Sequence, residues 1–174
     1  MKQGVVSSQM QIKMANKKDI AAMVKLSYQK RKSYEKAQSQ FWKYAEGAEG
    51  IQNKWFEELL EHRDYILLTA KENSRILGFI IGRLIKAPEV YNPGGLTLLI
   101  DDFCCEDWLN IGEPLMNKIA KIAKDKGAVQ FCVVAGNHDL EKCEFLEEFG
   151  LACASKWYVG NIGAKTSQSL RHPI

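Results

Sequence analysis

The stretch that decides the fold begins with Leu96-Thr97-Leu98-Leu99-Ile100, which is apolar except for one threonine. A run of this kind is typical of a strand that is covered on both faces of a sheet. After a polar turn at Glu106-Asp107, apolar residues recur at helical spacing up to Ala123, and Gly127 suits the left-handed position after a helix. A strand that leads directly into a helix leaves amide groups unpaired, and the helix dipole adds partial positive charge there. The stretch therefore predicts a site for an anion such as a pyrophosphate.

Length and composition indicate one ordinary globular domain. The chain has 174 residues, of which 46% are hydrophobic and 26% are charged. We expect a single domain over residues 1–174, with a core over about 10–160 and a tail over 161–174. The net charge of +3 is too small to indicate nucleic-acid binding.

The cysteines and the apolar runs indicate the compartment. Five cysteines are an odd number, and they lack the paired spacing of a zinc site, so we expect reduced thiols and no metal. No stretch approaches the roughly 20 apolar residues of a membrane span, and the first residues contain no long apolar region. The sequence therefore predicts a soluble, cytoplasmic protein that does not bind membranes.

The first half of the chain predicts a strand, helices and a hairpin. We expect a strand at 10–14, a helix capped by Asn16, two helical pieces between Gln40 and His62, and paired strands at 64–70 and 76–85. The basic cluster Lys30-Arg31-Lys32 is most simply the solvated side of the first helix, although it can also attract an anionic ligand.

The second half predicts two more strands around a helix. We expect a buried strand at 128–135, a helix that Asp139 caps and that ends at Gly150, and a last strand at Trp157-Tyr158-Val159. Only one strand is evident after Gly150. The edge of the sheet is therefore a place where a second subunit could add a strand, and a homodimer is possible.

The order of these elements resembles the GCN5-related N-acetyltransferase (GNAT) family over about residues 10–160. Asp101-Asp102-Phe103-Cys104-Cys105 stands where that family has its fourth strand, and Ile111-Gly112 opens a helix that resembles the acyl-CoA pyrophosphate helix. Phe145 to Leu151 resembles the signature before the family's sixth strand. The resemblance implies an α/β fold with a mixed, mostly antiparallel central sheet, splayed between its fourth and fifth strands, and helices on both faces.

Three residues depart from the family's pattern. Its loop reads Arg/Gln-x-x-Gly-x-Gly/Ala, whereas here Asp107 stands at the basic or amide position and Asn110 at the first glycine. The segment before Gly112 is also shorter than usual. An acid beside a pyrophosphate is unfavourable unless its side chain turns away, but main-chain amides can still hold the phosphates. The tyrosine that often protonates the leaving thiolate in the family is replaced by Leu146.

The resemblance implies where a cosubstrate binds. Acetyl-CoA or another acyl-CoA is expected to contact Phe103, Cys104, Cys105, Leu109, Asn110, Ile111, Gly112, Glu113 and Asp139. A main-chain amide of one of the first three would polarise the thioester oxygen.

Two residues are the candidates for acid–base catalysis. Asp102 is expected to be the base or the amine-binding carboxylate, with Glu106 in reserve, because Asp101 and Asp102 should point to opposite faces of the strand. Asp102 can equally well cap backbone amides. His138 can replace the missing tyrosine, or it can be a hydrogen-bonded structural residue.

The leading prediction is an acyl-CoA-dependent N-acyltransferase that transfers acetyl to a primary amine on a small molecule or a protein terminus. The alternative is a non-catalytic acyl-CoA-binding module of the same fold, which the altered loop and the absent tyrosine favour. A third possibility is a protein-interaction module that uses the aromatic residues near Trp42 and Trp55.

Overall fold

The computed structural model describes residues 9–162, so residues 163–174 of the expected tail lie outside the described residues. One sheet has the strand order β1-β2-β3-β4-β5. Its strands are β1 (Gln11–Met14), β2 (Tyr65–Glu72), β3 (Arg75–Ile85), β4 (Leu96–Cys105) and β5 (Ala128–Val133). The first four are antiparallel neighbours, whereas β4 and β5 are parallel. The predicted mixed, mostly antiparallel sheet is confirmed.

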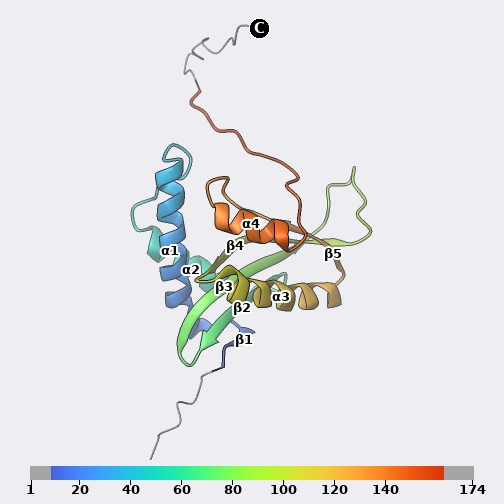
Figure 1. Ribbon diagram of the computed structural model, residues 1–174, viewed down its shortest axis with the longest axis horizontal. Coiled ribbons are helices and arrows are strands. Elements are labelled where there is room, and N and C mark those ends of the chain that lie inside the picture. The colour runs from blue at the N-terminus through green and yellow to red at the C-terminus, as the bar shows by residue number, and fades with distance from the viewer. Residues whose placement is uncertain (1–8, 163–174) are drawn as a thin grey trace, which may run out of the picture.

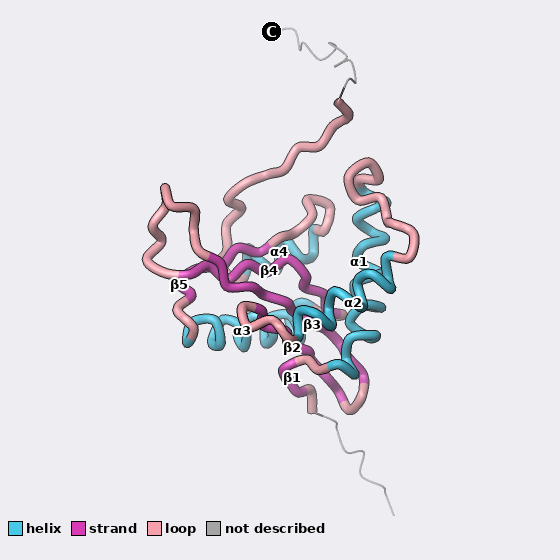
Figure 2. Tube along the Cα trace, turned by 180° about the vertical axis from the view of Figure 1, so that it is seen from behind, coloured by secondary structure: helices cyan, strands magenta, loops and turns pink. Residues whose placement is uncertain are grey.

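Helices cover both faces of this sheet, as expected (Figure 1, Figure 2). One face is covered by α1 (Ile20–Ala37) and α2 (Ala48–Leu60), whose buried residues Met23 and Phe56 pack against Phe79 of β3. The other face is covered by α3 (Glu113–Asp125) and α4 (Leu140–Glu148), which contribute Leu115 and Phe145 to a second core. The sheet is therefore the middle layer, which is why β4 is apolar on both sides.

A bulge and a splay lie in the middle of β4. Asp102 pairs with Ile81 and Ile100 pairs with Gly82, so that Asp101 between them has no partner on β3. Pairing with β5 ends near Ile100, whose carbonyl accepts from the Val134 amide at 2.8 Å. Because β4 continues to Cys105, its last five residues part from β5. The bulge and the splay place residues 101–105 at the centre of the molecule with one edge unpaired.

Two predicted elements are wrong. Residues 38–47 form turns instead of a helical piece, because Gly47 adopts a left-handed φ of 69° and the ring of Trp42 packs edge-on against Tyr34. The predicted strand at Trp157–Val159 does not form. It has no strand beside it, and Trp157 and Tyr158 are 79% and 91% exposed. Gln40 and Asn161 instead join this segment to the 38–47 turns by a side-chain hydrogen bond of 2.5 Å.

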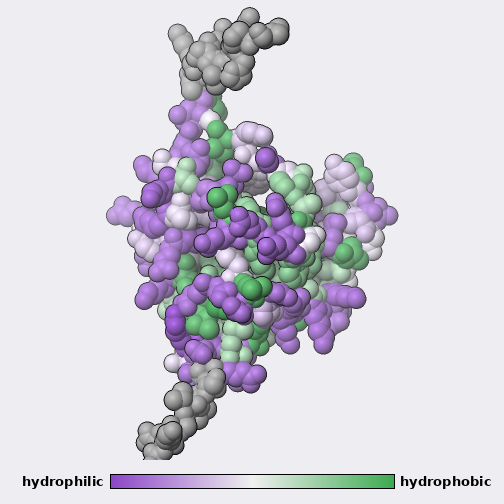
Figure 3. Space-filling view, viewed as in Figure 1, coloured by the Kyte–Doolittle hydropathy of each residue, from purple (hydrophilic) through white to green (hydrophobic). Residues whose placement is uncertain are grey.

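The fifth strand also differs from its prediction. β5 ends at Val133 instead of Ala135, and it is half exposed instead of buried, because within residues 9–162 no strand pairs with its outer edge. Hydrophilic and hydrophobic residues alternate over the visible surface (Figure 3). None of the described helices combines the length and the apolar character needed to cross a membrane.

Candidate functional site

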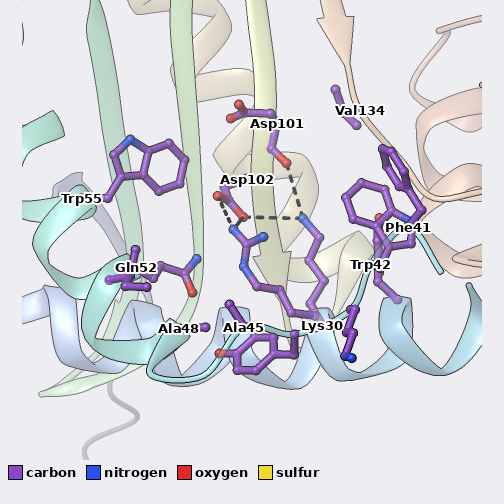
Figure 4. Close-up of a pocket in the computed structure, with 15 residues that line it drawn as sticks. Lys30, Phe41, Trp42, Ala45, Ala48, Gln52, Trp55, Asp101, Asp102 and Val134 are labelled. Carbon is purple, nitrogen blue, oxygen red and sulfur yellow. Dashed lines mark hydrogen bonds and ion pairs between the residues drawn. The ribbon is translucent and has the colours of Figure 1, made fainter. Parts of the chain in front are cut away.

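A cavity of about 520 Å³ opens between α1, the 38–47 turns, α2 and the bulge of β4 (Figure 4). We call it the aromatic cavity because five rings line it: Tyr34, Phe41, Trp42, Tyr44 and Trp55. Figure 4 shows Trp55 on one side of the cavity and Phe41 with Trp42 on the other. Edge-on contacts fix two of these rings, with centroids 4.5 Å apart for Phe41 and Trp42. Such a rigid apolar wall is typical of a small-molecule site.

An ion cluster forms the floor of the aromatic cavity. Asp102 is only 4% exposed, and its carboxylate lies 3.1 Å from Arg31 Nη2 and 3.7 Å from Lys30 Nζ. Lys30 Nζ also donates to the main-chain oxygen of Asp101 at 3.4 Å, as Figure 4 shows. Burial by itself would lower the pKa of Lys30, but the acidic groups around it, Cys104, Asp102 and Tyr34, raise that pKa above its ordinary value. Lys30 therefore stays charged.

Two buried polar residues hold Arg31 in place. The amide of Gln52, turned so that its oxygen faces Ser27 and Arg31, accepts from Arg31 Nε at 3.1 Å and from Nη2 at 2.9 Å. Its contact with Ser27 Oγ is 2.7 Å. The guanidinium is thus fixed between α2 and β4, which makes it a preorganised group and not a mobile surface charge.

Asp101 supplies a second carboxylate beside this cluster. Asp101 and Asp102 were expected to point to opposite faces of the strand, so that only one of them would reach a site. Instead, the bulge breaks the alternation and both residues line the aromatic cavity. Asp101 is exposed, and no described cation lies within ion-pair distance of its carboxylate. Partial burial and the charge of Asp102 raise the pKa of Asp101. Asp101 is therefore the accessible carboxylate of the two, and its pKa is raised above the ordinary value.

The loop predicted to hold a pyrophosphate does not have the predicted free amides. Trp108–Gly112 forms a π-helical turn that runs into α3, and the amides of Ile111 and Gly112 both donate to the Asp107 carbonyl, at 3.0 and 3.1 Å. The Asp107 carboxylate accepts from the Asn110 amide at 2.9 Å and from the Asn110 side chain at 2.7 Å. These hydrogen bonds lower the pKa of Asp107. Asp107 therefore caps the helix as an internal anion.

Acidic side chains surround this capped loop. A second cavity of about 270 Å³, between the π-helical turn and α4, is lined by four carboxylates: Asp107, Glu141, Glu144 and Glu148. We call it the acidic mouth. The loop amides favour a negatively charged group, as the Asp107 carboxylate demonstrates, whereas the acidic mouth opposes one. A diphosphate fits this loop only after the Asp107 side chain has turned away.

A lysine lies where β4 and β5 part. Lys142 of α4 is 0% exposed, and its Nζ donates to the Val134 carbonyl at 2.8 Å. The same nitrogen lies 5.6 and 5.9 Å from the ring centroids of Phe103 and Trp108. Burial, and then the charge of Lys30, lower the pKa of Lys142 to about 7. The amine is thus partly neutral near pH 7, and it contacts the unpaired end of the sheet.

The remaining predicted residues are placed as follows. His138 is exposed, and its ring packs edge-on against Tyr34 with centroids 4.4 Å apart. Asp139 precedes α4 but makes no side-chain capping hydrogen bond, so the predicted cap is wrong. Glu106 pairs with Arg75 at 2.6 Å on the surface, and Glu113 is exposed in the first turn of α3.

Neither cysteine of β4 is suited to be a nucleophile. Burial raises the pKa of the Cys104 thiol and raises that of Cys105 to about 12, so neither is a thiolate near neutral pH. Among residues 9–162, His, Cys, Asp and Glu form no group of three or more that could hold a metal ion.

Sequence reasoning missed the ion cluster. Lys30 and Arg31 were assigned to the solvated side of the first helix, but their side chains turn inward to Asp102. The signal was present in the spacing. The buried stripe Ile20, Met23, Val24 and Ser27 continues at helical periodicity to Arg31 and Tyr34.

The comparisons with known proteins give relatives by structure alone. No protein-family model and no curated protein matches the chain. A tetramutant of the BH1408 protein from Bacillus halodurans superposes with a TM-score of 0.75 at 16% identity, over 87% of this chain and 99% of that chain.

Two further solved structures carry a stated activity. A predicted acetyltransferase from Clostridium acetobutylicum, with acetyl-CoA, gives a TM-score of 0.66 at 19% identity over 88% of this chain and 96% of that chain. A ribosomal-protein-alanine N-acetyltransferase from Brucella melitensis biovar Abortus 2308 gives 0.62 at 18% identity, over 89% of this chain and 100% of that chain. With its sheet order, its bulged and splayed fourth strand and these neighbours, the chain has the fold of the GCN5-related N-acetyltransferases.

Proposed function

We propose that this protein is an acyl-CoA-dependent N-acyltransferase whose acceptor amine binds in the aromatic cavity. The observation that supports this most is the accessible Asp101 carboxylate at the β4 bulge, beside a ligand-sized cavity and at the point where β4 parts from β5. A predicted acetyltransferase of this fold has been crystallised with acetyl-CoA. The acceptor would be a primary amine.

The chain's own residues would perform two tasks. Asp101 would accept a proton from the bound ammonium group, and its raised pKa suits it to that role better than an ordinary aspartate. Asp102, the predicted base, is held by Lys30 and Arg31, and we assign it a positioning role that keeps both cations at the cavity floor. The amides of Phe103, Cys104 and Cys105 stay the candidates for polarising the acyl oxygen.

Acyl-CoA, when bound, supplies the activated acyl thioester. The amides of Leu109 and Asn110 would hold its diphosphate once the Asp107 side chain has turned away. An N-cap hydrogen bond contributes about 0.5–2 kcal/mol, so this rearrangement is affordable for a ligand that brings two phosphates. Leu146 is buried at the position of the family's missing tyrosine, and His138 stays the candidate for an acid.

The test measures release of CoA from acetyl-CoA against a panel of primary amines, with wild type and Asp101→Asn. We expect turnover with at least one amine and a loss of roughly 100-fold or more in kcat for the variant, as for removal of a general base. Unchanged turnover in Asp101→Asn would remove Asp101 from the mechanism. Saturable acetyl-CoA binding without release of CoA across the panel would favour the second candidate, a non-catalytic acyl-CoA-binding module. The internally capped loop is the observation that favours that candidate.

A further inference from the structure

We propose that the aromatic cavity binds a free α-amino acid with an apolar side chain. This inference names the acceptor class for the transfer proposed above and in that sense rests on it, but the binding itself needs no acyl-CoA. It follows from three features that meet in the cavity: a surplus of buried positive charge, an accessible carboxylate next to it, and aromatic walls.

The surplus charge comes from the ion cluster at the floor. Two cations, Lys30 and Arg31, share the single carboxylate of Asp102. The other oxygens they contact, from the Asp101 main chain and the Gln52 amide, are neutral. The Asp101 carboxylate acts on Lys30 only from beyond ion-pair distance, so the two cations share one directly contacting carboxylate in a partly desolvated place, where an incompletely paired charge is unfavourable. A carboxylate from a ligand would neutralise it, and Arg31 offers a planar group suited to that contact.

The second feature is the carboxylate of Asp101, which suits an ammonium group. Lys30 Nζ lies 3.4 Å from the main-chain oxygen of Asp101, so the cation contacts the main chain of the residue that carries the second carboxylate. An α-amino acid carries its ammonium and its carboxylate on one carbon atom, and it therefore requires an anion and a cation side by side. Figure 4 shows the main-chain oxygen of Asp101 directed toward Lys30, whereas the Asp101 carboxylate lies on the far side of that residue from Lys30.

The third feature is the wall that remains for the side chain. Trp42, Trp55 and Phe41 surround the charged groups, and Ile51 and Val134 complete the apolar lining. A cavity of about 520 Å³ has room for an aromatic or branched side chain in addition to the amino and carboxyl groups. A charged side chain would lose hydration against these rings, and the lining contains one further charged residue, Lys43. The side chain of the acceptor is therefore apolar.

The experiment compares three matched probes by calorimetric titration of the full-length protein without acyl-CoA. L-Phenylalanine carries both charges, L-phenylalaninamide lacks the carboxylate, and 3-phenylpropionate lacks the ammonium group. We expect saturable binding of phenylalanine and at least tenfold weaker binding of the other two. L-Leucine tests whether a branched side chain is accepted. No saturation with either amino acid, or equal affinity for all three phenyl compounds, would overturn the proposal.

Variants assign each charge to its residue. Arg31→Gln removes one cation and should weaken phenylalanine at least tenfold while leaving phenylalaninamide unchanged. Asp101→Asn should weaken phenylalanine and its amide but not 3-phenylpropionate. Lys25→Gln, on the exposed side of α1, is the charge-matched control and should change none of them. If Arg31→Gln fails to fold, Asp101→Asn at its exposed position decides the matter alone, because this variant must lose the discrimination between phenylalanine and 3-phenylpropionate.

The amino-acid site and the enzymatic activity can fail separately. Binding of phenylalanine without any release of CoA from acetyl-CoA would leave the site in place and remove the proposed function. Turnover with amines that lack a carboxylate, together with no binding of amino acids, would keep the proposed function and remove the site.

Discussion

Replacing Lys142 by methionine should stabilise the protein, and the gain should vanish as the pH rises. Methionine keeps the length of the side chain and removes a fully buried amine whose pKa is lowered to about 7. Because this pKa lies below that of a lysine in the unfolded chain, the unfolded state binds more protons between about pH 7 and 10.5. The wild type therefore gains stability as the pH rises through that window, and its stability is lowest below pH 7.

The structure sets the size of the effect. A pKa lowered from 10.5 to about 7 corresponds to roughly 5 kcal/mol at 1.36 kcal/mol per pKa unit, as an order of magnitude. The substitution also leaves the Val134 carbonyl without its donor at 2.8 Å, a loss of about 1–3 kcal/mol. We therefore expect Lys142→Met to be about 2–4 kcal/mol more stable at pH 6, in line with other replacements of buried charges by apolar groups. By pH 9 the wild type should have recovered about 2.7 kcal/mol, which removes most of the difference.

Urea unfolding at pH 6, 7, 8 and 9 measures this difference directly, because histidines and carboxylates titrate alike in both proteins and cancel. Lys121→Met, at an exposed position of α3, is the matched control and should show a pH dependence parallel to that of the wild type. Parallel curves for wild type and Lys142→Met would refute the reasoning, because they would mean that the buried amine is charged over the whole range. A variant that is less stable at every pH would show that the contacts with Phe103 and Trp108 outweigh the burial of charge.

Three further predictions concern the loop and the sheet. Asp107→Asn keeps an equally good helix cap but removes its charge, so titration with CoA should give about fivefold or more tighter binding than for wild type; unchanged affinity would mean that Asp107 does not compete. Affinity for CoA should rise between 20 and 150 mM NaCl (~8 Å screening length at the upper end), since salt screens the acidic mouth, and a fall would show that attraction dominates. Gly78→Ala would place a methyl group 2.7 Å from Cys105 Cβ and 2.9 Å from Ile111 Cγ2, and should destabilise the protein by about 1–3 kcal/mol in thermal unfolding, with the exposed Gly50→Ala as the control.

The sequence could predict the elements that follow from hydrophobic periodicity. It could not predict those that form only beside another segment of the chain. The apolar run at Leu96–Ile100 and the stripe of α3 specify a buried strand and its covering helix, because burial follows directly from the pattern. The last strand failed for the opposite reason: Trp157–Val159 has the composition of a strand, but a strand exists only beside a neighbour.

The candidate site was only partly predictable, for two physical reasons. A bulge such as that at Asp101 shifts side chains between faces and leaves no mark in the hydrophobic pattern, so periodicity could not indicate that Asp101, and not Asp102, is the exposed carboxylate. Asp107 followed by Asn110 is an ordinary helix-capping arrangement. The Asp107 carboxylate accepts a hydrogen bond from the Asn110 amide, which was expected to bind a phosphate. In both cases two negative groups compete for one position: Asp101 or Asp102 in the aromatic cavity, and Asp107 or a phosphate at the helix start. The sign of the charge is the same for both groups and could not decide between them.

The electrostatics of the two cavities bear on the choice between an enzyme and a binding module. An internal cap of about 0.5–2 kcal/mol weakens a competing diphosphate by no more than about 30-fold, since 1.4 kcal/mol corresponds to a factor of ten. That is a change in affinity and not a loss of the site, because the Leu109 and Asn110 amides remain at the helix start. The acceptor side, in contrast, holds two cations against one buried carboxylate, next to an accessible second carboxylate. A ligand that brings a carboxylate and an ammonium group would complete this cluster, and such a ligand favours an enzyme with an amine acceptor over a module that binds acyl-CoA alone.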